Sequence, residues 1–134
     1  MGYSVNFSAA FMGEIIPAEF WQGVEQFNQR EFYACHDTLE ALWMESMEPQ
    51  KRFYQGILQI AVGLYHLSNQ NRRGAVMLMG EGIRRLDYYQ PEYSGINVEK
   101  LMMQTSAILQ QLQQADTETS SDFHDLELPQ IQKV

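Results

Sequence analysis

The string His36-x-x-x-Glu40-x-x-Trp43 places three chemically capable side chains on one face of a predicted helix. At about 100° per residue, positions four and seven apart fall within an arc of about 60°. An imidazole and a carboxylate on one face form either a structural hydrogen-bonded pair or the edge of a binding pocket. A carboxylate also fixes the tautomer of a histidine that binds a metal. Spacing alone favours the structural pair, and both interpretations stay open at this point.

Two ligands do not complete a metal site, and His66 is the third candidate. The predicted helix over residues 50–69 carries one polar stripe between two apolar rows: Arg52, Gln55, Gln59 and His66. If this stripe points inward, His36, Glu40 and His66 form a two-histidine, one-carboxylate set that suits a divalent transition metal. The two glutamines would then face the motif across a shared polar pocket, with Trp43 as its wall. The alternative is that the stripe faces water.

Two glycines lie beside this stripe, at positions 56 and 63. Glycine in a helix interior costs ~1 kcal/mol relative to alanine, so a pair of them indicates the close approach of a neighbouring element. We predict that the helix carrying His36 makes this approach, because the polar groups of the two helices could then satisfy one another.

The sequence also offers one candidate nucleophile, Cys35, which is the only cysteine in the chain. Neighbouring positions on a helix diverge by about 100°, so Cys35 and His36 do not face each other. A buried thiol is therefore the better interpretation. The sequence contains no Ser/His/Asp order, phosphate-binding glycine loop or Cys-x-x-Cys pair. It names no reaction and does not decide whether the protein is an enzyme.

Apolar residues recur with helical spacing through most of the chain and predict an all-α fold without a sheet. The predicted helices cover residues 17–27, 31–46, 50–69, 72–89 and 98–115, the last capped by Asn97. Short connections favour a compact array or bundle of antiparallel neighbours. We place a break near Asn28, since asparagine tolerates the left-handed turn that ends helices. An unbroken helix to Met44 is the alternative.

The length of 134 residues fits one domain, which we assign to residues 1–115, with residues 1–16 as an N-terminal arm. Residues 116–134 are rich in acidic residues, Thr and Ser, and we predict a mobile tail. Within this tail Phe123, Leu126 and Leu128 are the candidate anchors.

The charge balance bears on partners and location. Lys and Arg total 9 against 17 Asp and Glu, a net charge of −8. Such a surface repels phosphate backbones and anionic lipids, so nucleic acid and membrane are unexpected partners. No apolar stretch approaches the ~20 residues that span a bilayer, and no signal peptide is recognisable. We therefore expect a cytoplasmic protein, with a second copy or another protein as its partner.

Three motifs together resemble a known bacterial and archaeal family. They are Phe27-Asn28, His36-x-x-x-Glu40-x-x-Trp43 and Gln55-Gly56-x-x-Gln59. The family is catalogued as domain of unknown function 309, and the resemblance fades after about Leu86. It implies an all-helical fold and a functional, metal-binding use of the histidine motif. One departure is Gln29-Arg30, where the family often has a glycine turn.

Two classes of function remain open on these grounds. The first is a small helical domain with a His/Glu pocket that binds a metal or small ligand. The alternative is a non-catalytic protein–protein interaction module. A convergent His/Glu/Gln pocket in the structure would favour the first class. A broad exposed apolar groove, with His36 and Glu40 paired with each other in the core, would favour the second.

Overall fold

The structure is a computed structural model, and it describes residues 16–114 and 123–134. Within these ranges it contains five α-helices: α2 (Ala18–Asn28), α3 (Phe32–Glu45), α4 (Gln50–Ser68), α5 (Arg72–Leu86) and α6 (Val98–Gln114). The all-α class is therefore confirmed. The predicted N-terminal arm, apart from residue 16, lies outside the described residues.

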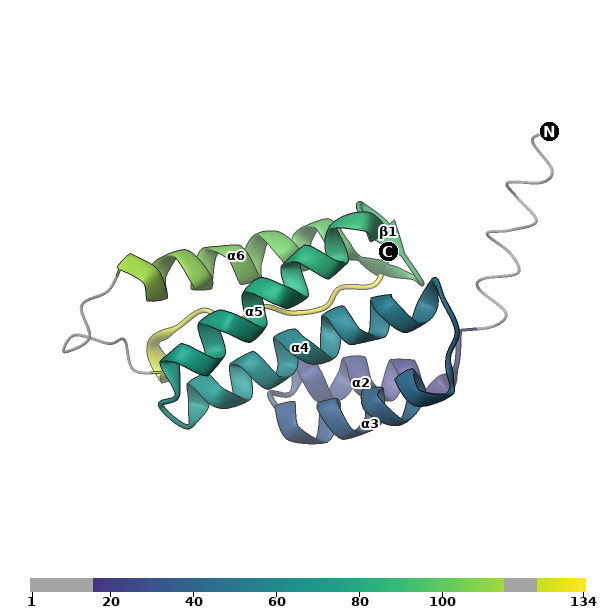
Figure 1. The fold of residues 1–134 in the computed structure, drawn as a ribbon, viewed down its shortest axis with the longest axis horizontal. Helices are drawn as coiled ribbons and strands as arrows, with labels where there is room; N and C mark the ends of the chain where they lie inside the picture. The colour runs from purple at the N-terminus through teal and green to yellow at the C-terminus, as the bar shows by residue number, and fades with distance from the viewer. Residues whose placement is uncertain (1–15, 115–122) are drawn as a thin grey trace.

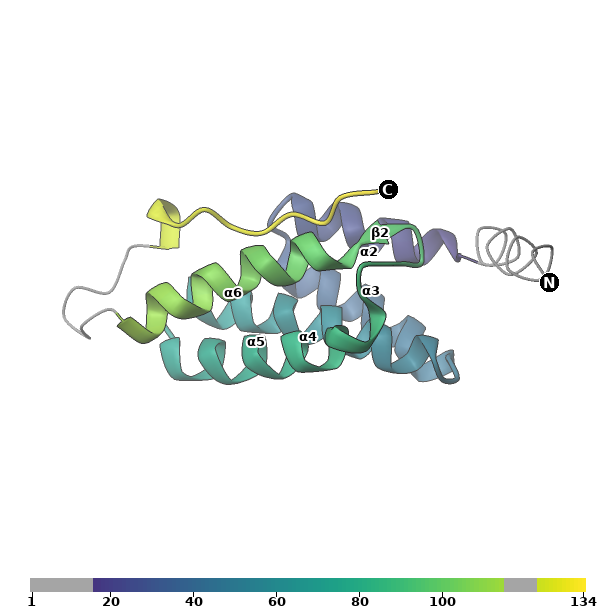
Figure 2. The same cartoon turned by 90° about the horizontal axis from the view of Figure 1, so that it is seen from above.

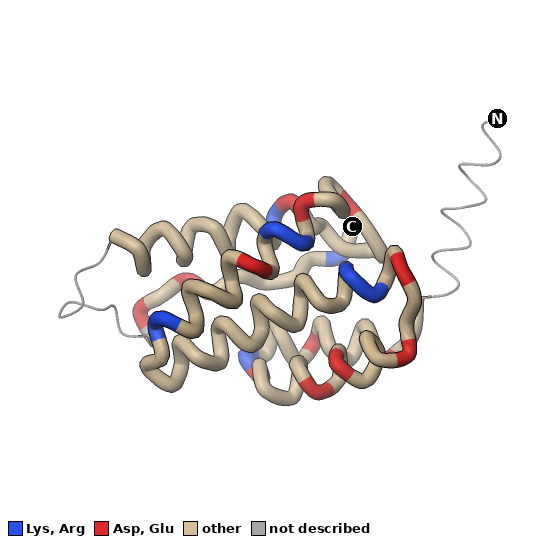
Figure 3. Tube along the Cα trace, in the orientation of Figure 1, with Lys and Arg blue, Asp and Glu red and all other residues tan. Residues whose placement is uncertain are grey.

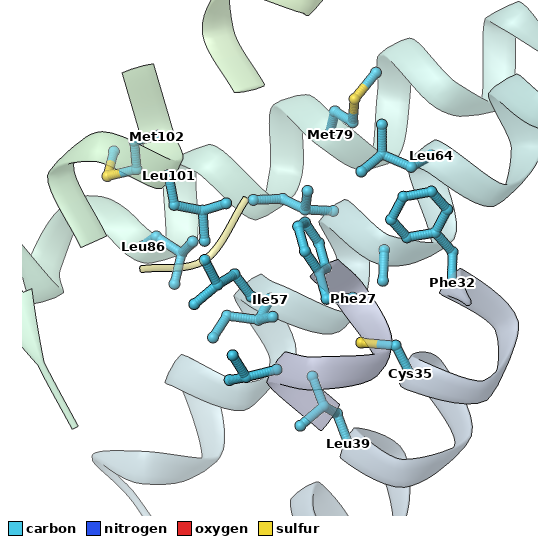
Figure 4. Close-up of a cluster of buried hydrophobic side chains, with 14 of the residues drawn as sticks. Phe27, Phe32, Cys35, Leu39, Ile57, Leu64, Met79, Leu86, Leu101 and Met102 are labelled. Atoms are coloured by element: carbon cyan, nitrogen blue, oxygen red, sulfur yellow. The ribbon is translucent and has the colours of Figure 1, made fainter. Parts of the chain in front are cut away.

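The centre of the fold is α4, which packs between α3 and α5 (Figure 1). Helix α2 packs on α3, and α6 packs on α5. The two apolar rows predicted for α4 account for its position, because a helix that is apolar on two sides can contact a neighbour on each. The core joins side chains from all five helices, among them Phe27, Leu39, Ile57, Leu86 and Leu101 (Figure 4).

The predicted break near Asn28 is confirmed, and its geometry is a Schellman closure. Helix α2 ends at Asn28, and Arg30 takes the left-handed conformation, with φ 66°. The Glu31 N–H then donates to the carbonyl of Gln26 at 2.9 Å, and the Arg30 N–H to that of Phe27 at 3.0 Å. The left-handed residue is thus an arginine two positions after the asparagine.

The prediction of a fold without a sheet was wrong in one place. A 3₁₀ turn, η1 (Asp87–Tyr89), is followed by two short antiparallel strands, β1 (Glu92–Tyr93) and β2 (Ile96–Asn97). Ser94 and Gly95 join them with φ values of 52° and 82°. Positive φ at both central residues is the geometry of a tight hairpin turn. The strands are too short for an alternating pattern to appear in the sequence.

The C-terminal residues differ from the predicted mobile tail. After a 3₁₀ turn, η3 (Phe123–Asp125), residues 126–134 run back along the molecule in an extended course (Figure 2). Leu126, Leu128 and Ile131 are buried against the helices. These apolar side chains anchor the segment although its average composition is polar. Residues 116–122 lie outside the described residues.

None of the described helices has both the length and the apolar character needed to cross a bilayer.

Candidate functional site

The residues of the His36 motif lie along the outer side of α3. The inner side of this helix is fixed by Phe32, Cys35, Leu39 and Leu42, which are buried. His36 follows Cys35 by one position and therefore lies about 100° round the helix, at the boundary between core and solvent. Its side chain is 24% exposed, and that of Glu40 is 49% exposed.

The imidazole of His36 lies between two carboxylates. Its Nε2 is 3.5 Å from Oε2 of Glu40, one turn along the helix. Its Nδ1 is 3.3 Å from Oδ1 of Asp37, a neighbour that we had not assigned to the site. Both ring nitrogens therefore face an acidic oxygen, and the two oxygens lie on opposite sides of the ring. This arrangement does not gather three donors around one point.

Trp43 contacts the start of α4. The Nζ of Lys51, at the start of α4, lies 4.3 Å from the centre of the Trp43 ring and donates to its backbone carbonyl at 3.0 Å. The indole Nε1 is buried and has no hydrogen-bond partner among the described residues. The cation–π contact and the hydrogen bond fasten the end of α3 to α4.

The polar stripe of α4 does not face α3, contrary to our prediction. Gln59 is buried and points to α5, where its Nε2 donates to Glu81 at 3.2 Å and its Oε1 accepts from Arg85 at 3.1 Å. His66, near the end of α4, has its Nδ1 3.3 Å from Nδ2 of Asn71. Gln55 is partly exposed, and the structure does not bring it to the motif as a described contact.

The two glycines of α4 explain this orientation. A Cβ built on Gly56 would lie 2.8 Å from Leu86, and one built on Gly63 would lie 2.7 Å from Met79. Both neighbours belong to α5. The prediction of a close approach was therefore right, but the approaching helix is α5. Because the glycines face α5, Gln59 of the neighbouring polar stripe also contacts α5 and not α3.

The proposed metal set is consequently not assembled. Among the described residues, no three His, Cys, Asp or Glu side chains are grouped so that they could hold a metal ion. His66 was inferred from helical periodicity, which gives the angle of a residue around its own helix but not the neighbour it faces.

Three large side chains on or just after α3 are exposed, and the sequence analysis had not assigned them to the site. Tyr33, Met44 and Met47 are 58%, 68% and 81% exposed. The ring of Tyr33 lies 6.2 Å from that of His36 and 5.2 Å from that of Tyr65 on α4. Tyr33, Glu40 and Met44 are separated by seven and four residues, so their spacing alone could have shown that they share a side of the helix. We call Tyr33, His36, Asp37, Glu40 and Met44 the α3 face.

Three hollows in the surface lie away from the histidine. They have volumes of about 320, 370 and 530 Å³, and none of the three is lined by His36, Glu40 or Trp43. The second touches the edge of the α3 face through Tyr33 and Tyr65. In the structure the motif therefore belongs to a surface and not to one of these hollows.

Fold and motif together define a small helical domain with a histidine–carboxylate face. Residues 20–78 match the model of a family described as Domain of unknown function (DUF309), which confirms the resemblance drawn from the motifs. The match covers α2, α3, α4 and the first half of α5. The chain is also similar to the Uncharacterized protein YpuF of Bacillus subtilis (strain 168), with 36% identity over 109 residues. This alignment covers 79% of the chain and 60% of the relative's length.

The donor geometry gives a direct expectation for metals. With His66 turned to Asn71 and the two carboxylates on opposite sides of His36, we expect zinc, manganese or nickel at millimolar concentration to leave the melting temperature unchanged. A ligand that binds only the folded state would raise it. His36→Ala and His66→Ala are the paired controls. A metal-dependent rise in the parent that disappears in both variants would show that the two histidines meet after all.

Proposed function

We propose that this protein is a non-catalytic interaction module, and that the α3 face binds a partner segment with basic and apolar side chains. The observation that supports this most directly is the position of His36. It lies between two carboxylates on the outer side of α3, with the exposed ring of Tyr33 beside it and the exposed Met44 further along the same helix. This is the make-up of a protein contact surface, where aromatic residues and methionine are enriched.

The charge of this part of the chain favours a basic partner. Between residues 31 and 48 there is no Lys or Arg. The acidic residues of this stretch are all exposed: Glu31, Asp37, Glu40, Glu45 and Glu48. Figure 3 shows them as red bands along α3 and the turn that follows it. Charge complementarity of this kind steers association and selects partners more than it adds affinity.

The apolar part of the face supplies a contact that can adapt to its partner. Met44 is among the most exposed apolar side chains described, and Met47, in the turn that follows α3, is more exposed still. Methionine is unbranched and polarisable, and surfaces that bind several helical partners use it often. Tyr33 adds a ring with a hydroxyl, which is suited to a boundary between apolar contact and solvent.

The test uses a synthetic amphipathic helical peptide with leucine on one side and lysine on both flanks. We expect saturable binding, with amide chemical-shift changes concentrated on α3. Removing two acidic charges with Asp37→Asn and Glu40→Gln should weaken binding roughly three- to tenfold, since exposed ion pairs contribute ~0.2–1 kcal/mol each. The effect should shrink as salt is raised.

The matched control removes the same charge elsewhere. Glu92 on β1 and Glu99 on α6 are also exposed, and Glu92→Gln with Glu99→Gln should leave the affinity nearly unchanged. A second peptide with glutamate in place of lysine should not bind. Equal loss of affinity in both double variants would mean that only net charge matters, and the proposal would fail. Shift changes away from α3 would have the same meaning.

A further inference from the structure

The C-terminal segment, residues 123–134, runs between α2 and α6 (Figures 1 and 2). It reaches α2 through Asn28 and α6 through Lys100 and Gln104. The two helices are far apart in the sequence, and the segment fills the space between them. We call the surface of α2 and α6 that the segment covers the α2–α6 groove.

The groove recognises the backbone of the segment. The Asn28 Nδ2 donates to the carbonyl of Ile131 at 2.9 Å, and its Oδ1 accepts from the N–H of the same residue at 2.7 Å. The Gln104 Oε1 accepts from the N–H of Gln130 at 3.0 Å. An amide side chain that pairs with both backbone groups of one residue replaces a strand neighbour, which is how extended peptides are commonly bound.

The end of the segment continues this pairing along the hairpin. The Asn97 N–H donates to the carbonyl of Gln132 at 2.8 Å, and the Val134 N–H donates to that of Gly95 at 3.0 Å. Lys133 forms an antiparallel bridge with Ile96. The segment is therefore an added strand at the edge of β2, so its register is fixed from Gln130 onward.

Side chains give the groove its selectivity. Leu126, Leu128 and Ile131 are 6%, 7% and 3% exposed, at spacings of two and three residues. The Nζ of Lys133 lies 4.8 Å from the centre of the Trp21 ring on α2. The ligand that fits is an extended peptide with three spaced aliphatic side chains followed by a cation.

We propose that the α2–α6 groove is a peptide-binding site that accepts this segment from a second copy in trans as well as its own in cis. The segment seated in the groove shows which chemistry fits, and every other copy carries the same residues. The contacts that the segment makes in cis and in trans are identical. The choice between them therefore depends only on the covalent connection through residues 115–122, which sets the effective concentration of the segment in cis. Exchange of an identical element is a common route to dimers.

The experiment replaces residues 116–121 of the full chain with a protease recognition sequence and cuts it after folding. A fluorescent peptide of residues 123–134 then stands for the segment of a second copy. We expect the labelled peptide to enter the cut protein and saturate, while unlabelled peptide displaces it. In the uncut protein the same peptide should bind at least about a hundredfold more weakly, because a covalently linked segment competes at a roughly millimolar effective concentration.

The decisive variant is Asn28→Asp in the cut protein. Aspartate keeps the acceptor for the Ile131 N–H but loses the donor and sets an oxygen against the carbonyl. We expect at least about tenfold weaker binding of the peptide. Gln22→Glu adds the same charge at an exposed position of α2 and should leave binding within about twofold, as is usual at such surface sites.

Three outcomes would overturn the proposal. The cut protein could unfold when the segment leaves, which would make the segment part of the core and the groove no binding site. The labelled peptide could fail to enter while the fold persists. Asn28→Asp and Gln22→Glu could also weaken binding equally, so that recognition would not depend on the Asn28 pair. None of these results bears on the α3 face.

Discussion

Replacing Gly82 with alanine should lower the free energy of unfolding by about 2 kcal/mol, the cost of overpacking a close helix contact. A Cβ at this position would lie 2.7 Å from the carbonyl oxygen of Gly56 and 2.7 Å from Cγ1 of Ile60. The first neighbour is backbone, so it cannot rotate away. Accommodating the methyl group would require α4 and α5 to separate along a contact that carries much of the core.

The matched control lies two residues earlier on the same helix. Apart from the adjacent backbone of its own helix, no heavy atom lies within 4 Å of a Cβ added to Gly80, so Gly80→Ala changes only the backbone preference. We expect this variant to be more stable than the parent by about 0.5–1 kcal/mol, the difference between glycine and alanine in a helix. Urea unfolding followed by circular dichroism measures both. Equal effects of the two substitutions would show that the α4–α5 approach is looser than described.

The comparison of Gly80 with Gly82 also shows where prediction from sequence ends. Helical spacing was enough to find the five helices, because each buries a stripe of the kind that Leu101, Thr105, Ile108 and Leu112 form on α6. Glycine content was enough to indicate a close helix contact. Neither signal contains the identity of the neighbour, which depends on how all the helices pack together.

Prediction of the candidate site was limited in the same way, because the sequence does not show which helix a given side chain faces. His36 and Glu40 were placed correctly as a pair because both lie on one helix, where geometry is fixed by spacing. Gln59 and His66 were assigned to their site by assuming that α4 turns its polar stripe to α3. The structure pairs Gln59 with Glu81 and Arg85 instead, so the buried amide is satisfied by α5.

The C-terminal segment shows a different limit. Its composition is that of a disordered tail, yet three aliphatic residues and the amide of Asn28 hold it against the body. Average composition does not distinguish a tail without anchors from one whose few anchors meet a matching groove. The Phe27-Asn28 motif was noted in the sequence as a family feature, and the contact with Ile131 gives its asparagine a physical role.

Cys35 should react with a thiol reagent at pH 8 at least about a thousandfold more slowly in the folded protein than after unfolding. Burial raises the pKa of this thiol from its ordinary value of 9.0 to about 12, because desolvation penalises the thiolate. Three pKa units reduce the thiolate fraction at pH 8 by about a thousandfold, and the thiolate is the reactive form. Figure 4 shows the side chain directed into the core near Leu39.

The control carries its thiol on the same helix but on the outer side. Tyr33→Cys in a Cys35→Ala background places the thiol where the parent residue is 58% exposed, and it should react at the rate of an ordinary thiol.

The raised pKa of Cys35 also makes the stability of the protein depend on pH. The buried neutral thiol contributes to stability below pH 9, and this contribution is lost as pH rises from about 9 towards 12. The parent should therefore lose stability relative to Cys35→Ala across that range. Fast labelling of the folded parent at pH 8 would instead mean that α3 opens from α2 and α4, exposing the inner side of the helix that carries the histidine motif.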